Sequence, residues 1–123
     1  MPKVIIRFFQ LEDGICPLID WLDTVTPKKA KAKVLARILL LESLGHEIRR
    51  PHADLLEDGI YELRERFMST QFRVLFFFHG QGVVVVSHGF TKHGASVPSS
   101  EIERAKVYKT MFLKNPEKHT YEE

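Results

Sequence analysis

The sequence predicts an α+β fold in which helices pack on one face of a small, twisted, mainly antiparallel sheet. The first observation is a strand-like run followed by two helical segments in the N-terminal part of the chain. The second is a series of three strand-like runs, and the third is a helix with one apolar stripe near the C-terminus. This order of elements is typical of folds that segregate their helices against a sheet. We therefore expect the other sheet face to be open to solvent or to a partner.

The N-terminal part is expected to form one strand and two helices. Residues 4–9 alternate between β-branched or aromatic residues and others, which predicts the strand. Pro17 suits the first turn of a short helix. A longer helix is expected to have Thr26 as its cap, Pro27 in its first position and Gly45 as its stop. Its apolar residues recur at helical spacing: Ala30, Val34, Ile38 and Leu41.

The second half is expected to form a meander and a final helix. Residues 45–59 show no sustained periodicity, which predicts an irregular connection. Strand-like runs follow at 60–67, 72–78 and 83–90. The intervals of about four residues between them are typical of hairpins, so these runs should pair antiparallel. Ser100 and Glu103 have capping-box spacing, and the helix that they begin carries an apolar stripe of Ile102, Ala105, Tyr108 and Phe112.

Length and composition favour one globular domain spanning residues 1–123. The hydrophobic share of 44% and the charged share of 28% exclude disorder and a fibrous architecture. No apolar stretch approaches the ~20 residues that cross a bilayer, and the N-terminus does not resemble a signal peptide. Cys16 is the sole cysteine, which excludes an internal disulfide and fits a reducing compartment. We therefore expect a cytoplasmic protein with no membrane association.

Basic residues are unevenly placed although the net charge is only +2. Residues 28–50 contain seven lysines and arginines, including Arg49 and Arg50, against two glutamates. This excess allows a local basic surface. For a charge run alone, the simpler interpretation is that the lysines solvate the outer face of a helix.

Three arginines are expected to lie on one face of the meander. Because side chains alternate along a strand, Glu62, Arg64 and Arg66 share a face. In the next strand, Arg73 lies opposite the apolar stripe that should enter the core. An unpaired buried charge is costly, so Arg73 must have a partner. That partner is either a carboxylate, Glu62 or Glu65, or a phosphate that the three arginines grip together.

Lys92 and His93 lie where the chain leaves the third run of the meander. Such rims often carry active-site residues. Histidine transfers protons near neutral pH and lysine stabilises developing negative charge, so with the arginines this set suits phosphoryl-transfer chemistry. No histidine pair or acidic cluster has the spacing of a metal site, and we expect no metal or other cofactor.

Three motifs together resemble the phage-derived HigB-like branch of the RelE/ParE toxin superfamily. They are LEDGIYELR (56–64), FRVLFF (72–77) and HGFTKH (88–93). The match continues into the last helix through Pro98, Glu101, Ile102 and Ala105. The succession of these fragments at these intervals carries the resemblance, because each fragment alone is short.

The resemblance implies a RelE-like fold, metal-independent cleavage of mRNA at the ribosome and neutralisation by a cognate antitoxin of helical or helix-turn-helix type. It places Arg64, Arg73 and Lys92 at positions that are basic in the ribonuclease members. We expect His93 to complete the catalytic set, although relatives often have a second lysine there. The arginines expected to bind RNA are Arg66, Arg49 and Arg50.

Two other functions fit the same resemblance. One is a ParE-like inhibitor that binds a topoisomerase and has no nuclease activity, since one fold supports both functions. The other is an inactive phage-derived relative, because no tyrosine follows Gly94 where some relatives use one for proton transfer. The retained basic residues favour the endoribonuclease.

Overall fold

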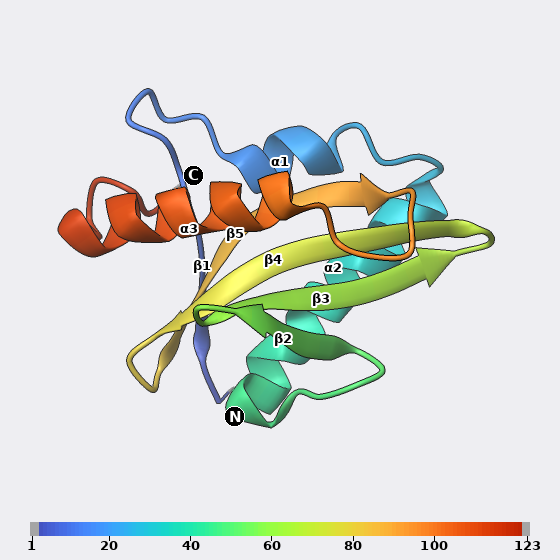
Figure 1. Ribbon diagram of the computed structural model, residues 1–123, viewed down its shortest axis with the longest axis horizontal. Coiled ribbons are helices and arrows are strands. Elements are labelled where there is room, and N and C mark those ends of the chain that lie inside the picture. Colours follow the sequence, from blue (N-terminus) through green and yellow to red (C-terminus); the bar gives the residue numbers. More distant parts are fainter. Residues whose placement is uncertain (1–2, 122–123) are drawn as a thin grey trace.

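The computed structural model describes residues 3–121, and within this range the fold is α+β, as predicted, with a five-stranded mixed sheet and three α-helices (Figure 1). In chain order the elements are β1 (Ile5–Phe8), α1 (Pro17–Leu22), α2 (Lys28–Leu44), a 3₁₀ turn (Gly45–Glu47), β2 (Ala53–Glu57), β3 (Ile60–Phe67), β4 (Thr70–His79), β5 (Val83–Lys92) and α3 (Ser99–Lys114). No helix in this range is both long and apolar enough to cross a membrane.

The sheet has the strand order β1-β5-β4-β3-β2. The neighbours from β2 to β5 pair antiparallel, which confirms the predicted meander, while β1 pairs parallel with β5. The register places Arg64 of β3 directly opposite Arg73 of β4, and Gln71 of β4 opposite Lys92 of β5. Four residues expected to bind or act on RNA therefore lie on neighbouring strands: Arg64, Arg66, Arg73 and Lys92.

Strand β2 lies within the segment predicted to be irregular, so that prediction is wrong for residues 53–57. β2 forms a hairpin with β3 through Asp58 and Gly59, whose φ angles are 50° and 77°. Positive φ at both central residues is what a tight hairpin turn requires, and Asp-Gly is a favoured pair for it. β2 is an edge strand with a mixed polar sequence, and its strand conformation depends on pairing with β3 rather than on its own hydrophobic pattern.

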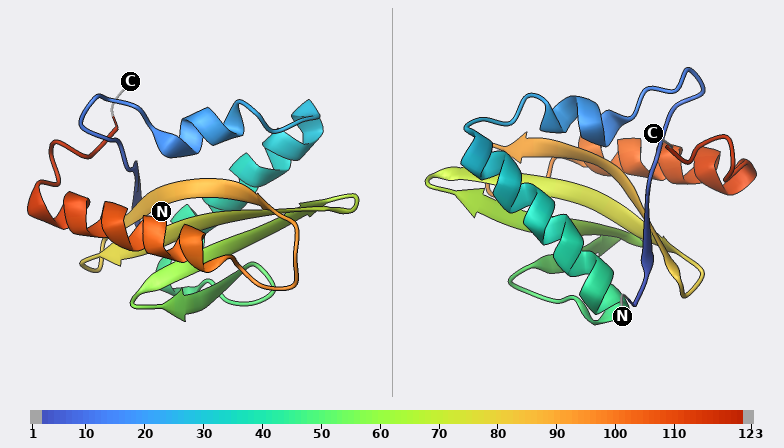
Figure 2. Two further views of the ribbon diagram at one scale, coloured as in Figure 1. Left: turned by 45° about the horizontal axis from the view of Figure 1, so that its top comes forward. Right: turned by 180° about the vertical axis from the view of Figure 1, so that it is seen from behind.

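Helices cover both faces of the sheet, which corrects the expectation of one open face (Figure 2). One apolar cluster joins α1 and α2 to Leu63, Val74 and Phe76. A second cluster on the other face joins Ala105 and Phe112 of α3 to sheet residues that include Ile60, Leu75 and Phe77. The central strands carry apolar side chains on both faces. The second apolar face is removed from water only because α3 packs on it.

Helix α3 is tied to the sheet by polar contacts at two places. His88 of β5 is buried. Its Nε2 lies 3.0 Å from Glu101 Oε1, and its Nδ1 lies 2.8 Å from Ser87 Oγ. Burial lowers the pKa of His88 to about 3, with the charge of Arg104 adding to the shift, so the ring is neutral. Lys106 contacts Glu57 and Asp58, which anchors α3 to the β2–β3 turn.

Both predicted N-terminal caps are wrong, whereas the predicted stop is confirmed. Helix α2 begins at Lys28, and its cap position is held by the extended Pro27, whose side chain has no polar atom to cap the helix. Helix α3 begins one residue earlier than the predicted cap, so Ser100 lies inside its first turn. Gly45 ends α2 with a φ of 55°, a left-handed conformation that favours glycine.

Candidate anion-binding site

A groove of about 720 Å³ lies where β3 and β4 approach α2 and the segment before β2. Five arginines and one glutamate line it in the described part of the chain, and this arginine groove consists of Arg37, Arg50, Pro51, His52, Arg64, Glu65, Arg66, Gln71 and Arg73. Such an excess of guanidinium groups in one concave surface attracts anions, and guanidinium geometry matches phosphate.

The register opposes Arg64 and Arg73, and like charges at such positions repel. Glu62 compensates this repulsion, because its Oε1 lies 3.2 Å from Arg73 Nε and 3.5 Å from Arg64 Nε. Arg73 is 2% exposed and Glu62 is 6% exposed. Arg73 also donates to the Phe72 carbonyl at 3.0 Å and to Gln71 Oε1 at 2.8 Å. The ion pair that the sequence allowed for Arg73 is therefore present.

The burial of the Arg73 guanidinium is only partly compensated by hydrogen bonds. Its buried Nε–H has no hydrogen-bond acceptor among the described residues, because the Glu62 oxygen lies near it without hydrogen-bond geometry. Burial lowers the pKa of Arg73 from its ordinary value, and the nearby Glu62 carboxylate opposes this shift. A buried cation with an incompletely satisfied donor at a groove wall strengthens the local attraction for an anion.

Two groove residues that sequence reasoning missed are Arg37 and His52. Arg37 donates from Nε and Nη2 to Glu65 Oε2 at 3.1 and 2.9 Å, and its Nη1 contacts Nδ1 of His52. Because a guanidinium only donates, a hydrogen bond at this contact would use Nδ1 as the acceptor and leave the ring proton on Nε2. Nε2 is then the ring nitrogen that remains for a ligand in the groove. The sequence signal was weak, because Arg37 sits among lysines and the contact joins distant segments.

A second groove, of about 350 Å³, adjoins the first and contains Lys92. Lys92 Nζ donates to the Ala95 carbonyl at 3.2 Å. Arg50 forms an ion pair with Asp54 at 2.6 Å, and Arg50 lowers the pKa of that carboxyl. This Lys92 groove shares three residues with the arginine groove: Arg50, Arg64 and Arg73.

The structure does not bring two of the sequence-predicted residues into these grooves. His93 is exposed and lines a separate cavity with Trp21. Arg49 folds back, because its Nη1 donates to the backbone carbonyls of His46 and Ile48. By contrast Arg66 lines the arginine groove, where its Nε donates to the carbonyl of Met68.

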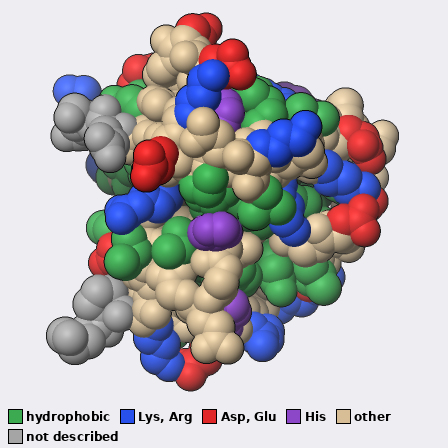
Figure 3. All heavy atoms as spheres, turned by 90° about the vertical axis from the view of Figure 1, so that its left-hand side faces the viewer, with side chains coloured by type: hydrophobic (Ala, Val, Ile, Leu, Met, Phe, Trp, Pro, Cys, Tyr) green, Lys and Arg blue, Asp and Glu red, His purple; other side chains and the backbone are tan. Residues whose placement is uncertain are grey.

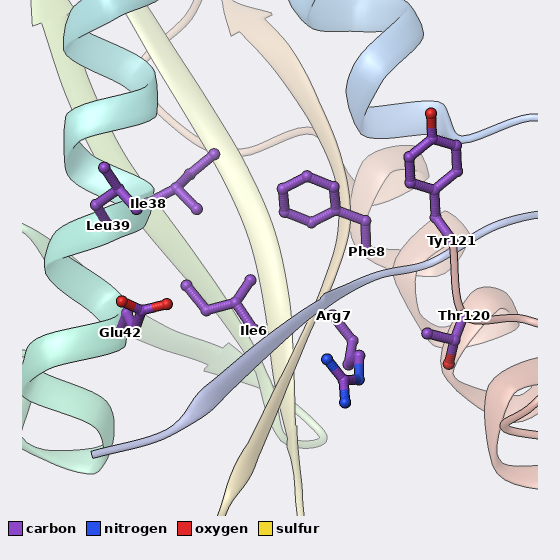
Figure 4. Close-up of a pocket in the computed structure, with 8 residues that line it drawn as sticks. All are labelled: Ile6, Arg7, Phe8, Ile38, Leu39, Glu42, Thr120 and Tyr121. Atoms are coloured by element: carbon purple, nitrogen blue, oxygen red, sulfur yellow. The ribbon is translucent and has the colours of Figure 1, made fainter. Parts of the chain in front are cut away.

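Two other parts of the described surface differ from the arginine groove in their charge. Figure 3 shows the end opposite the β3–β4 turn, where Lys and Arg side chains are interspersed with acidic and hydrophobic ones. A further cavity of about 410 Å³ lies between α2 and β1 (Figure 4). Its wall is mainly apolar, from Ile6, Phe8, Ile38 and Leu39, with one charge of each sign at Arg7 and Glu42. It has no cluster of groups for phosphoryl chemistry.

Comparison with known proteins now places the chain in a family. No protein with curated annotation matches the sequence. The family model described as phage-derived protein Gp49-like matches residues 20–110, well over half of the chain. These residues include the arginines of the groove and Lys92. The family is compatible with the toxin of a toxin-antitoxin system and suggests an antitoxin partner. The chain thus belongs to the Gp49-like family of phage-derived proteins, within the RelE/HigB-like toxin superfamily.

Proposed function

We propose that this protein is the toxin of a type II toxin-antitoxin system, on the HigB-like branch of its superfamily. In this proposal it acts in the cytoplasm as a metal-independent endoribonuclease that cleaves mRNA at the ribosome, and a cognate helix-turn-helix antitoxin holds it inactive. The observation that carries the proposal is the arginine groove, which gathers five guanidinium groups and a histidine in one concave surface.

RNA cleavage without a metal needs a bound scissile phosphate and stabilisation of the negative charge that develops on it. Arg64 is the candidate for direct contact, because about a third of its side chain is exposed in both grooves. Arg73 is nearly buried, so it contributes charge and holds Glu62 and Gln71 in place. Lys92 supplies a further cation at the adjoining groove.

His52 replaces His93 as the histidine of the proposed mechanism. With Nδ1 occupied by Arg37, its Nε2–H can donate a hydrogen bond to a phosphoryl or leaving oxygen. A neutral imidazole is suited to this role as a donor. The carboxylate in the groove, Glu65, is bound by Arg37. Removal of the 2′-hydroxyl proton and protonation of the 5′-oxygen that leaves are therefore assigned to solvent or the ribosome, which also positions the RNA.

The proposal is tested by mapping transcript 5′ ends after a brief pulse of expression in bacteria. Wild type should arrest growth with translation falling before DNA synthesis, and should produce new ends within translated messages. Arg64→Ala should lower cleavage by on the order of 10²-fold, as for other preorganised electrostatic donors. Arg104→Ala, which removes a partly exposed arginine outside both grooves, should cleave like wild type. Normal growth at confirmed expression, or DNA synthesis failing first, would contradict the nuclease.

Two substitutions in the same assay distinguish whether His52 donates a hydrogen bond or transfers a proton. Glutamine offers an N–H donor near the position of Nε2 but cannot carry a proton, so His52→Gln should keep most of the cleavage that His52→Ala loses. Equal losses in both variants would instead assign proton transfer to His52.

A further inference from the structure

A third cavity, of about 620 Å³, adjoins the two grooves at Arg50. This Tyr61 pocket is lined by His46, Ile48, Arg49, Arg50, Ala53, Asp54, Leu55 and Tyr61. Arg50 lines all three cavities, and Asp54 lines this pocket and the Lys92 groove. A ligand bound to Arg50 in the arginine groove can therefore extend into the Tyr61 pocket without leaving the surface.

The aromatic wall of the pocket is held rigidly. The Tyr61 ring stacks on the fully buried Phe76, with centroids 5.4 Å apart, and meets Phe78 edge-on at 5.2 Å. Tyr61 is partly exposed. A fixed, partly exposed ring is a surface on which a planar group can stack with little loss of side-chain entropy.

The remaining walls select the kind of planar group. Leu55 is 53% exposed and Ile48 is buried, so the pocket offers apolar surface beside the ring. Arg49 is fixed by its hydrogen bonds to two backbone carbonyls. With Arg50, it gives the pocket two planar, cationic guanidinium groups. Apolar and aromatic surface flanked by guanidinium groups matches a nucleobase joined to a phosphate, since bases stack on aromatic rings and arginines.

We propose that the Tyr61 pocket is a nucleobase subsite for single-stranded RNA whose adjacent phosphate lies in the arginine groove. This assignment rests on the proposed function and adds a second point of contact to it. Arg49 does not line either groove, but it lines the Tyr61 pocket. In this proposal it contacts the RNA beside the base and not at the phosphate. Because stacking tolerates every base, the subsite gives affinity and register with little sequence preference.

The test measures fluorescence anisotropy with two labelled probes. One is a short single-stranded RNA with 2′-fluoro groups that prevent cleavage, and the other has the same backbone without bases. Tyr61→Leu keeps an apolar side chain and should weaken binding of the base-bearing strand on the order of ten-fold, the scale of one stacking contact. It should leave the abasic strand unchanged, and Tyr61→Phe should bind both like wild type. Arg64→Ala should weaken both strands.

The outcomes separate this inference from the proposed function. If a folded Tyr61→Leu protein binds both strands like wild type, the subsite is overturned while phosphate binding stands. If wild type binds neither strand, the subsite is likewise overturned, while growth arrest and transcript-end mapping decide the proposed function separately. Should Tyr61→Leu not fold, wild type is photocrosslinked to RNA that contains 5-iodouridine. Crosslinks within residues 46–61 support the subsite, and crosslinks confined to other peptides overturn it.

Discussion

Arg73 illustrates how burial changes the expected effect of a substitution. On an exposed strand face its loss would change stability little, but here it is 2% exposed and pairs with an equally enclosed Glu62. Removing Arg73 leaves the buried Glu62 carboxylate with only the more distant, partly exposed Arg64 as its partner. The residue therefore contributes to the fold as well as to the proposed phosphate site, and these two contributions need separate measurements.

We expect Arg73→Ala to lower the free energy of unfolding by about 3–5 kcal/mol, the usual cost of breaking a buried pair. The double variant Arg73→Ala with Glu62→Gln should recover part of this loss, because no charge is then left buried. Urea unfolding of both single variants and the double variant checks this. An Arg73→Ala protein as stable as wild type would show that the pair contributes nothing.

The residues around the arginine groove fall into two groups, those that the sequence predicted and those that it did not. Strand parity correctly placed Glu62, Arg64 and Arg66 on one face, because side-chain alternation is a local property. His52 and Arg37 could not be found in this way. Their contact joins α2 to the segment before β2, and only the packing of the helix against the sheet creates it.

At the scale of elements, helix α1 packs on β5 because Gly89 has no side chain. A Cβ added at Gly89 would lie 2.1 Å from Trp21 Cε3, far inside any permitted contact. We expect Gly89→Ala to displace Trp21 and to destabilise the protein by about 1–3 kcal/mol, as overpacked cores do. Tryptophan fluorescence and thermal unfolding report both changes.

Gly82→Ala is the matched control for this substitution. A Cβ at Gly82 meets nothing within 4 Å, and its φ is not in the left-handed region. Its stability should stay within about 0.5 kcal/mol of wild type, the usual range of surface substitutions. A similar loss in both variants would place the effect in the glycine backbone and not in the Trp21 contact.

In the hairpin of β2 and β3, the turn residues predict the structure better than the hydrophobic pattern of β2 does. Asp58 and Gly59 are a strong turn pair, and both adopt the positive φ that the turn requires. The pair alone would have predicted a strand on each side of it. The preceding five residues lack clear alternation, since they occupy a sheet edge and are partly exposed on both sides.

At the scale of the whole molecule, two apolar clusters lie on opposite faces of one sheet. Neighbouring residues of β4, such as Phe76 and Phe77, enter different clusters, so one cluster cannot melt without exposing the strand that carries the other. We therefore propose one domain and expect one cooperative unfolding transition. Tryptophan fluorescence, which reports the α1 side, should coincide with far-ultraviolet circular dichroism. Separated midpoints would indicate two independently unfolding units.

The sequence by itself determined the order and type of most elements, the meander, the stop of α2 and the shared face of the strand arginines. These features depend on periodicity, turn residues and alternation, which act over a few neighbouring positions. Tertiary structure alone decided that α3 covers the second sheet face, that Glu62 lies between Arg64 and Arg73, and that His52 rather than His93 joins the arginine groove. Each of these depends on contacts between segments far apart in the chain, and no local pattern encodes which distant side chains will meet.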